Sequence, residues 1–279
     1  MLPRVAAARD GGMGVMPSRY RMALITGASS GIGAAFCGVL PPETGLLLTG
    51  RNAERLQAAA RRHATDGRTV ETLVADLAGE AGRRDLIAAA RTLPVDLLIN
   101  NAGFGAFGPC LANDAQLELD MLAVNVTAVV ELTHGLLPGM IERARSTGGR
   151  AGMIVVSSTV GFVPMAMMAT YAATKAFELS FAEALADELA NDPVDILTLC
   201  PGATRTDFFR RARMPDSFLR LAEEPTAVAR KALAALGRRR VLVSRRSMGL
   251  ALSPVSVPRR MVAFGARHFM HRIAGYGRQ

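Results

Sequence analysis

The stretch MALITGASSGIG, residues 22–33, joins a short apolar run to a glycine-rich turn and then to a helical pattern. Glycine permits a tight turn and lets the backbone approach a pyrophosphate, while the helix that follows offers unpaired N–H groups to an anion. A glycine-rich turn alone is a weak signal, because ordinary strand–helix turns share it. Its place after the first strand favours a dinucleotide site formed by Gly27, Ser29, Ser30, Gly31, Ile32 and Gly33.

Apolar runs and helical patterns alternate along the rest of the chain. Alternation of this kind implies right-handed strand–helix–strand units, with ligands bound at the carboxyl ends of the strands. The sequence therefore predicts an α/β fold, a doubly wound Rossmann-type parallel sheet of about seven strands with helices on both faces. The expected strands are 22–26, 46–49, 70–74, 95–99, 153–156, 196–199 and 241–243, and the expected helices are 32–39, 53–63, 80–91, 114–137, 171–190 and 225–236.

The chain is predicted to hold one catalytic domain over residues 20–245. Residues 1–19 are rich in Gly, Ala and Arg without periodicity, which indicates a disordered leader, and residues 246–279 form a basic C-terminal extension. Cys37, Cys110 and Cys200 are scattered without metal-ligand spacing, which predicts no metal site and suits a reducing, cytoplasmic compartment. No run of about 18 apolar residues is present, so we expect no membrane-spanning helix.

The net charge of +9 is concentrated at one end of the chain. Ten Arg and no acidic residue follow position 236, which leaves 23 basic against 24 acidic side chains before it. The near-neutral body argues against nucleic-acid binding. The basic extension has two interpretations: an amphipathic segment in peripheral contact with an anionic membrane, or a segment that packs over the cleft or at a subunit contact, which we favour.

The second expected strand is followed by Gly50 and Arg51, where a site for NAD(H) usually has a carboxylate that binds the adenosine ribose. A guanidinium can instead bind a ribose phosphate, so we expect NADP(H) rather than NAD(H) as the cofactor. The alternative is an Arg that only faces solvent. Asp76 and Leu77 are expected near the adenine, unless Asp76 merely starts a helix, and Asn101, Ala102 and Gly103 are expected to line the cleft.

A second cluster of polar residues follows the buried strand 153–156. Ser158 comes at the end of this strand, and Tyr171 and Lys175 lie four residues apart in a helical pattern, which puts them on one helix face. An ammonium beside a phenol lowers the phenol pKa from about 10, as acid–base work near neutral pH requires. A Tyr–Lys pair also occurs by chance, but a strand-terminal Ser and a nucleotide fold favour catalysis.

Taken in order, the motifs resemble the short, single-domain branch of the short-chain dehydrogenase/reductase family over about residues 20–245. The resemblance implies that Ser158 polarises a substrate carbonyl, that Tyr171 donates the proton, and that Lys175 holds the nicotinamide ribose and lowers the Tyr171 pKa. Asn125 would interrupt a helix and hold a water that relays protons through Lys175. The motifs are TGASSGIG at 26–33, DL at 76–77, NNAG at 100–103, Asn125, Ser158, YAATK at 171–175, and PG at 201–202 followed by Thr206.

The resemblance also implies contacts to the nicotinamide and an assembly. Pro201, Gly202, Thr204 and Thr206 would pass over the nicotinamide ring. A homodimer or homotetramer would form through the helices at 114–137 and 171–190.

Apolar residues near the expected cleft indicate the substrate class. We expect a wall formed by Phe104, Phe107, Phe162, Met165 and Phe208, joined by Val163, Met167, Met168 and Phe209, although about half of these side chains are expected to be ordinary core packing. The predicted function is NADPH-dependent reduction of a hydrophobic ketone or aldehyde. The alternatives are NAD(P)+-dependent alcohol oxidation, or a nucleotide-binding or membrane-recruited protein that has kept the fold.

Overall fold

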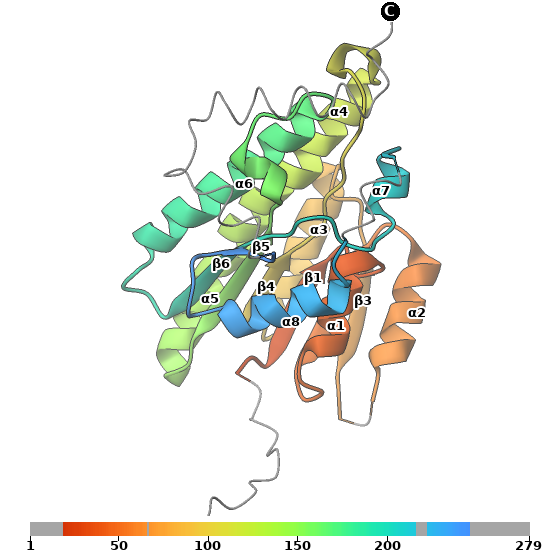
Figure 1. Ribbon diagram of the computed structural model, residues 1–279. Helices are drawn as coiled ribbons and strands as arrows, with labels where there is room; N and C mark the ends of the chain where they lie inside the picture. The colour runs from red at the N-terminus through yellow and green to blue at the C-terminus, as the bar shows by residue number, and fades with distance from the viewer. Residues whose placement is uncertain (1–18, 66, 216–221, 246–279) are drawn as a thin grey trace, which may run out of the picture.

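A seven-stranded parallel sheet forms the centre of the computed structural model, which describes residues 19–65, 67–215 and 222–245 (Figure 1). The strand order is β3-β2-β1-β4-β5-β6-β7, and every pairing is parallel. This confirms the predicted fold class. The strands are β1 (Met22–Thr26), β2 (Gly45–Gly50), β3 (Val70–Val74), β4 (Leu97–Asn100), β5 (Ala151–Val156), β6 (Val194–Cys200) and β7 (Val241–Val243).

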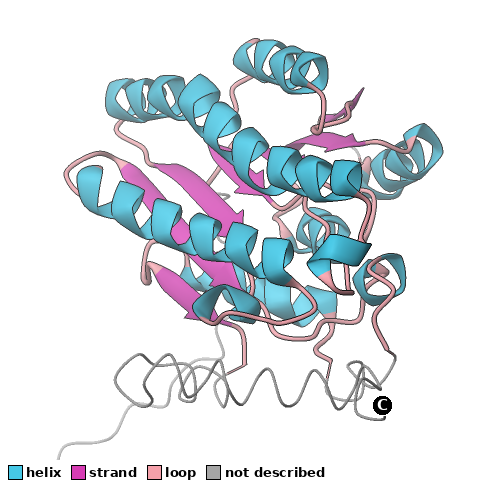
Figure 2. Cartoon of the chain, turned by 90° about the horizontal axis from the view of Figure 1, so that it is seen from above, coloured by secondary structure: helices cyan, strands magenta, loops and turns pink. Residues whose placement is uncertain are grey.

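Helices cover both faces of the sheet, as Figure 2 shows from above. Alternate residues of β1 point to opposite faces: Leu24 packs with α3, α5 and α6, whereas Ile25 packs with α1, α2 and α8. This explains why the central strands are apolar throughout rather than alternating. The helices are α1 (Gly31–Val39), α2 (Ala53–His63), α3 (Glu80–Arg91), α4 (Ala115–Leu122), α5 (Ala128–Thr147), α6 (Ala169–Glu188), α7 (Phe208–Arg211) and α8 (Pro225–Ala235).

The strand order reverses between β1 and β4, which are neighbours in the sheet although β2 and β3 lie between them in the chain. In open α/β sheets this reversal leaves a crevice outside the carboxyl ends of the strands. The register places Thr26 beside Thr49 and Asn100 beside Val155, so these strand ends meet at one edge. The loops that follow them carry most of the residues predicted to be functional.

The helix predicted at 114–137 is longer than expected and is built in three parts. α4 leads into a π-helical turn, η2 (Ala123–Thr127), and α5 then runs to Thr147, where Gly148 ends it in the left-handed region at φ +66°. The predicted end at residue 137 is wrong because Pro138 is accommodated inside α5. The turns beyond it bury Met140, Ile141 and Ala144 in the core, which outweighs the lost backbone hydrogen bond.

The continuous helical stretch Ala115–Thr147 is apolar enough over 18 residues to cross a bilayer by length and composition, unlike the expectation from the sequence. Half of that window is buried inside the protein, where α5 packs against α3 and β5. The apolar residues of this helix are explained by their packing against the sheet, so their composition is only weak evidence for a membrane span.

Some sequence predictions are left untested. Residues 1–18 of the predicted leader and all of the extension 246–279 lie outside the described residues, so the domain limits and both interpretations of the extension stay predictions. Leu119 and Leu122 on α4 are exposed, which suits a subunit contact, but the oligomeric state and the cytoplasmic location stay predictions too.

Candidate active site

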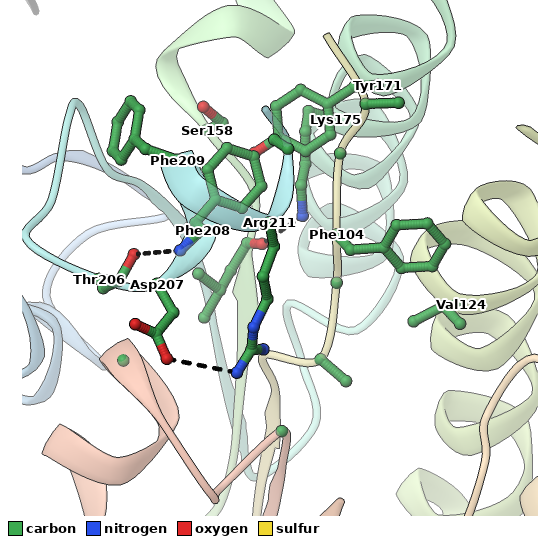
Figure 3. Close-up of a pocket in the computed structure, with 18 of the residues that line it drawn as sticks. Phe104, Val124, Ser158, Tyr171, Lys175, Thr206, Asp207, Phe208, Phe209 and Arg211 are labelled. Carbon is green, nitrogen blue, oxygen red and sulfur yellow. Dashed lines mark hydrogen bonds and ion pairs between the residues drawn. The ribbon is translucent and has the colours of Figure 1, made fainter. Parts of the chain in front are cut away.

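A cavity of about 1880 Å³ lies at the carboxyl edge of the sheet, above the ends of β1, β2, β4 and β5. It is larger than a drug-sized pocket and has room for a dinucleotide together with a substrate. Figure 3 shows one part of it, between α6, α7 and the loop after β4. The predicted residues that line it are Gly27, Ser29, Ser30, Gly31, Ile32, Arg51, Asp76, Leu77, Asn101, Ala102, Gly103, Ser158, Tyr171, Lys175, Pro201, Gly202, Thr204 and Thr206.

The glycines of the first turn form a floor on which a side chain would be strained. Gly27 and Gly31 have φ of +67° and +58°, a conformation that favours glycine, and a Cβ on Gly27 would lie 3.0 Å from the Ala102 Cα. The first turn of α1 has no capping side chain and no acidic residue. Its N–H groups are therefore available to an anion, and the floor fits the pyrophosphate of a dinucleotide.

Gly33 was predicted to bind the cofactor, but it does not line the cavity. Instead it packs α1 against the first turn: a Cβ there would lie 2.4 Å from the Gly27 carbonyl oxygen and 2.5 Å from Asn101 Nδ2. The shorter of these two contacts is with backbone, which cannot swing away. Gly33 therefore shapes the cofactor floor by allowing the helix to approach it.

Replacing Gly33 by alanine is expected to lower the free energy of unfolding by about 2 kcal/mol, because an added methyl group must push α1 away from the turn. Thermal unfolding followed by circular dichroism measures this loss. Gly38→Ala is the matched control, since the nearest atom to a Cβ there is 3.5 Å away, on the His63 side chain. Equal melting temperatures for both variants would contradict the packing role of Gly33.

Thr26, at the end of β1, ties the cofactor floor to the turn after β4. Its hydroxyl accepts hydrogen bonds from the backbone N–H groups of Asn101 and Ala102 at 2.9 and 2.8 Å, and the Asn101 side chain donates to the Thr26 carbonyl at 2.8 Å. The turn predicted at residues 101–103 is thus held at the crevice between β1 and β4. Sequence reasoning did not single out Thr26.

Two guanidinium groups line the end of the cavity where the adenosine is expected, called the adenosine end below. Arg51 follows β2 directly, and Arg55 lies one turn into α2, where the Asn52 side chain caps the helix by accepting a hydrogen bond from the Arg55 N–H at 2.8 Å. Position 50 is glycine, so the end of β2 carries no carboxylate. Asp76, after β3, lines the cavity and also accepts a hydrogen bond from the Ala78 N–H at 3.1 Å, so it starts a turn, and its contact with the adenine stays a prediction.

Arg55 also connects this end of the cavity with the opposite wall. Its guanidinium lies 3.4 Å from the carboxylate of Asp207, which precedes α7 and pairs with Arg210 at 2.9 Å as well. Figure 3 places Asp207 beside Arg211, with which it also pairs. Asp207 and Arg55 were not predicted from the sequence, because nothing local marks two surface charges 152 positions apart as partners.

Ser158, Tyr171 and Lys175 meet at the other end of the cavity (Figure 3). Ser158 follows β5, and its hydroxyl oxygen accepts a hydrogen bond from the Val160 N–H at 3.3 Å, so its own proton can be donated to a neighbour such as the Tyr171 oxygen. Tyr171 and Lys175 lie in the first half of α6, and the Lys175 ammonium is 5.7 Å from the centre of the Tyr171 ring. The predicted clustering of the three side chains is therefore present.

The sequence predicts a lowered pKa for Tyr171, and this prediction is wrong: the pKa is raised. Lys175 and a hydrogen bond from Ser158 lower the phenol pKa, but burial acts more strongly, and the Tyr171 pKa stays raised above its usual value. The phenol is covered by Phe208, whose ring centre lies 5.2 Å from that of Tyr171. The sequence predicted that Lys175 lies beside the phenol, but it did not predict that Phe208 covers it. This cover excludes the water that would stabilise a phenolate.

Asn125 lies behind the cavity rather than on its surface. It is fully buried in η2, which confirms the predicted interruption of the helix. Its side chain donates to the Phe104 carbonyl and the Thr174 hydroxyl, both at 3.0 Å, and accepts from the Phe104 N–H at 3.2 Å. These contacts join the loop after β4 to α6. The water predicted at Asn125 stays a prediction.

Phe104, Phe107, Met165 and Phe208 line the cavity as expected, together with Val163, Met168 and Phe209. The predictions for Phe162 and Met167 are wrong. η3 (Thr159–Phe162) presents only its first two residues to the cavity, and Met167, in the turn before α6, does not line it. Two backbone hydrogen bonds hold the wall together: the Phe107 N–H donates to the Ala212 carbonyl at 3.0 Å, and the Gly108 N–H donates to the Met167 carbonyl at 2.8 Å.

Some solved structures similar to this chain hold a bound nicotinamide nucleotide. A short-chain dehydrogenase from Sphingobium yanoikuyae, solved in complex with NADPH, is 31% identical, covers 90% of this chain and 94% of its own, and has a TM-score of 0.73. The bulky-bulky ketone specific alcohol dehydrogenase from Comamonas testosteroni is 26% identical over 93% and 95%, with a TM-score of 0.68. The inactive hydroxysteroid dehydrogenase-like protein 1 of Rattus norvegicus is 31% identical over 260 residues, 89% of this chain and 72% of that protein.

The fold and the site thus define a nucleotide-dependent oxidoreductase that acts on alcohol or carbonyl groups with NAD(P). Residues 21–216 match the model of the short chain dehydrogenase family. The chain belongs to the short-chain dehydrogenase/reductase family.

Proposed function

We propose that this protein reduces a hydrophobic ketone or aldehyde to an alcohol with NADPH. The observation that carries the proposal is the position of two hydroxyl groups, those of Tyr171 and Ser158, between a glycine floor and a wall of aromatic and methionine side chains. An apolar wall with a few polar groups that converge is typical of a site for a lipophilic substrate. Methionine adds a flexible surface that adapts to several shapes.

The protein's own residues would handle the proton. A bound nicotinamide would supply a hydride to the carbonyl carbon. The Tyr171 hydroxyl would donate its proton to the carbonyl oxygen, and its raised pKa keeps that proton in place until the substrate arrives. The Ser158 hydroxyl would donate a hydrogen bond to the same oxygen as negative charge develops there. The Lys175 ammonium would stabilise the phenolate that remains.

Arg51 and Arg55 support the choice of NADPH. Both line the adenosine end, and no acidic residue ends β2 to repel a ribose phosphate. A guanidinium binds a phosphate with charge-assisted and often bidentate hydrogen bonds. The complex of the Sphingobium yanoikuyae relative with NADPH supports the same choice.

Two other functions remain to be compared with this one. The same groups serve alcohol oxidation with NAD(P)+, because proton and hydride transfers are reversible. A nucleotide-binding protein without turnover is the second, favoured by the similarity to the inactive rat relative. Tyr171, Ser158 and Lys175 are all present here and lie together, which supports an enzyme.

A screen of carbonyl compounds with NADPH, followed by absorbance, tests the proposed function. Bulky aliphatic and aromatic ketones are expected to give kcat/KM values about 100-fold above those of small polar sugars, because a buried methylene group contributes about 0.8 kcal/mol. The same panel with NADH separates the cofactor from the substrate preference. Faster reduction of sugars than of lipophilic ketones would contradict the substrate class, and no turnover of any carbonyl compound would leave the nucleotide-binding function.

A further inference from the structure

The ammonium of Lys175 is held from behind by a carboxylate on its own helix. Both carboxylate oxygens of Glu178 lie 2.9 Å from Lys175 Nζ, and the ammonium also donates to the Val156 carbonyl at 2.9 Å. The side chains of the pair are only 5% and 2% exposed. Lys175 thus has a buried counter-ion one helical turn away, on the side facing β6, and Glu178 itself does not line the cavity.

No second charge competes for this ammonium among the described residues. The ionisable groups that interact with the pair are Tyr171 on α6 and Cys200 on β6, and burial raises the Cys200 pKa to about 12, which keeps that thiol neutral. β5, η2 and η3 bring no ionisable side chain. Other acids on packed elements have partners elsewhere: Glu118 with Asn113, Asp120 with Gln116, and Asp195 with Arg150.

An unpartnered ammonium would be unstable at this position. Removing a charge from water costs several kcal/mol, and a buried lysine without a counter-ion usually loses its proton instead. A single carbonyl, that of Val156, would not offset this cost. The charge beside Tyr171 therefore depends on Glu178.

We propose that Glu178 is a positioning residue for the reaction of the proposed function: its carboxylate keeps Lys175 protonated and fixed at the end of β5. The ammonium then stays beside the phenol at alkaline pH, where an isolated buried lysine would be neutral. Glu178 touches neither substrate nor cofactor in this arrangement and acts only through Lys175.

The directions of the pKa shifts agree with this geometry. Burial lowers the pKa of Lys175, but Glu178 and Tyr171 raise it, and the net shift is upward. Burial raises the pKa of Glu178 to about 7, although Lys175 pulls it down. The ion pair is therefore complete only above about pH 7, and it persists until Lys175 itself loses its proton above the usual lysine range.

The test measures the ionisation of Lys175 directly, without substrate. The chain has only two lysines, Lys175 and Lys231, so protein labelled with ¹³C at the lysine ε-carbons gives two NMR signals, which a Lys231→Arg variant assigns. In Glu178→Gln the midpoint of the Lys175 signal is expected to fall by one pH unit or more, since an opposite charge at this distance shifts a pKa by about 1–3 units. The Lys231 signal, paired with Glu223, is expected to stay unchanged.

Glu183→Gln is the matched control, because Glu183 lies on the same helix but is exposed. It removes the same charge and is expected to leave the Lys175 midpoint where it is. An unchanged Lys175 midpoint in Glu178→Gln, or an equal fall in both variants, would overturn the proposal.

A pH profile of carbonyl reduction gives the second measurement. Glu178→Gln is expected to lose activity on the alkaline side at a lower pH than the wild type, by the same shift as the NMR midpoint, whereas Glu183→Gln follows the wild type. A uniform loss of activity at every pH would point to a purely structural role and contradict the proposal. If no carbonyl compound turns over, the proposed function fails, but the NMR titration still decides the role of Glu178.

If Glu178→Gln does not fold, the same NMR titration of the wild-type protein tests the proposal. The Lys175 signal is expected to show a step near pH 7, as Glu178 takes up its proton. The Lys231 signal should show no such step, because its partners hold the Glu223 pKa below the usual value. A Lys175 signal without this step, with a midpoint below that of an ordinary lysine, would contradict the proposal.

Discussion

Replacing Tyr171 by phenylalanine is expected to lower kcat for carbonyl reduction about 1,000-fold, within the range that a lost general acid produces. The variant keeps the ring that packs against Phe208 and loses only the hydroxyl that would donate the proton. Because the cofactor floor is untouched, the dissociation constant of NADPH should change little. Steady-state kinetics and a fluorescence titration of NADPH measure the two quantities separately.

Tyr20→Phe is the matched control for this experiment. Tyr20 is also buried, but it precedes β1 at the opposite end of the sheet, so its variant should retain wild-type turnover. Turnover by Tyr171→Phe within a factor of about ten of the wild type would contradict the assignment of Tyr171 as the proton donor. If Tyr171→Phe lost both NADPH binding and turnover, the result would instead show that the substitution had damaged the site.

Replacing Arg51 by alanine is expected to raise the KM for NADPH by about 10- to 100-fold and to leave the KM for NADH nearly unchanged. The factor follows from the loss of one charge-assisted hydrogen bond to the ribose phosphate, which contributes about 1.5–3 kcal/mol. NADH lacks this phosphate, so it has nothing to lose. The ratio of the two kcat/KM values, measured with one ketone, reports the change.

Arg61→Ala controls for the general loss of positive charge, because Arg61 lies on α2 but does not line the cavity. Arg55 shares the adenosine end with Arg51, so the Arg51→Ala, Arg55→Ala double variant should lose more NADPH affinity than either single variant. Equal effects of Arg51→Ala on NADPH and NADH would contradict the cofactor choice.

The sequence predicted the sheet and the cavity well because both depend on local patterns. Most strands are apolar runs bounded by polar or glycine residues, and parallel strands bring their carboxyl ends to one edge. Gly27 and Gly31 could be predicted from the turn they permit, and Tyr171 with Lys175 from helical spacing. All of these features depend on residues that are close to one another in the sequence.

The features that were missed depend on contacts across the fold. Glu178 looked like an ordinary charge in a helix, although an acid three residues after Lys175 in an apolar stretch was a usable signal. Its burial against β6 could not be read locally. Phe162 has the right composition for a substrate wall, but the turn of η3 places it elsewhere. The pKa of Tyr171 depends on its cover by Phe208, which lies 37 positions later in the chain, at the start of α7.

The ion pair between Asp207 and Arg55 is a weak contact between two walls of the cavity. Its contact with Arg55 joins the wall that would carry the adenosine to the wall that would carry the substrate, and both side chains are partly exposed. Exposed ion pairs contribute only about 0.2–1 kcal/mol, so the walls can part there at small energetic cost. The glycine floor is backbone, and the buried Thr26 hydroxyl is held by two backbone N–H groups, so this part of the site stays rigid. A used nucleotide would then leave by separation of Arg55 from Asp207, while the hydroxyl groups of Ser158 and Tyr171 keep their positions.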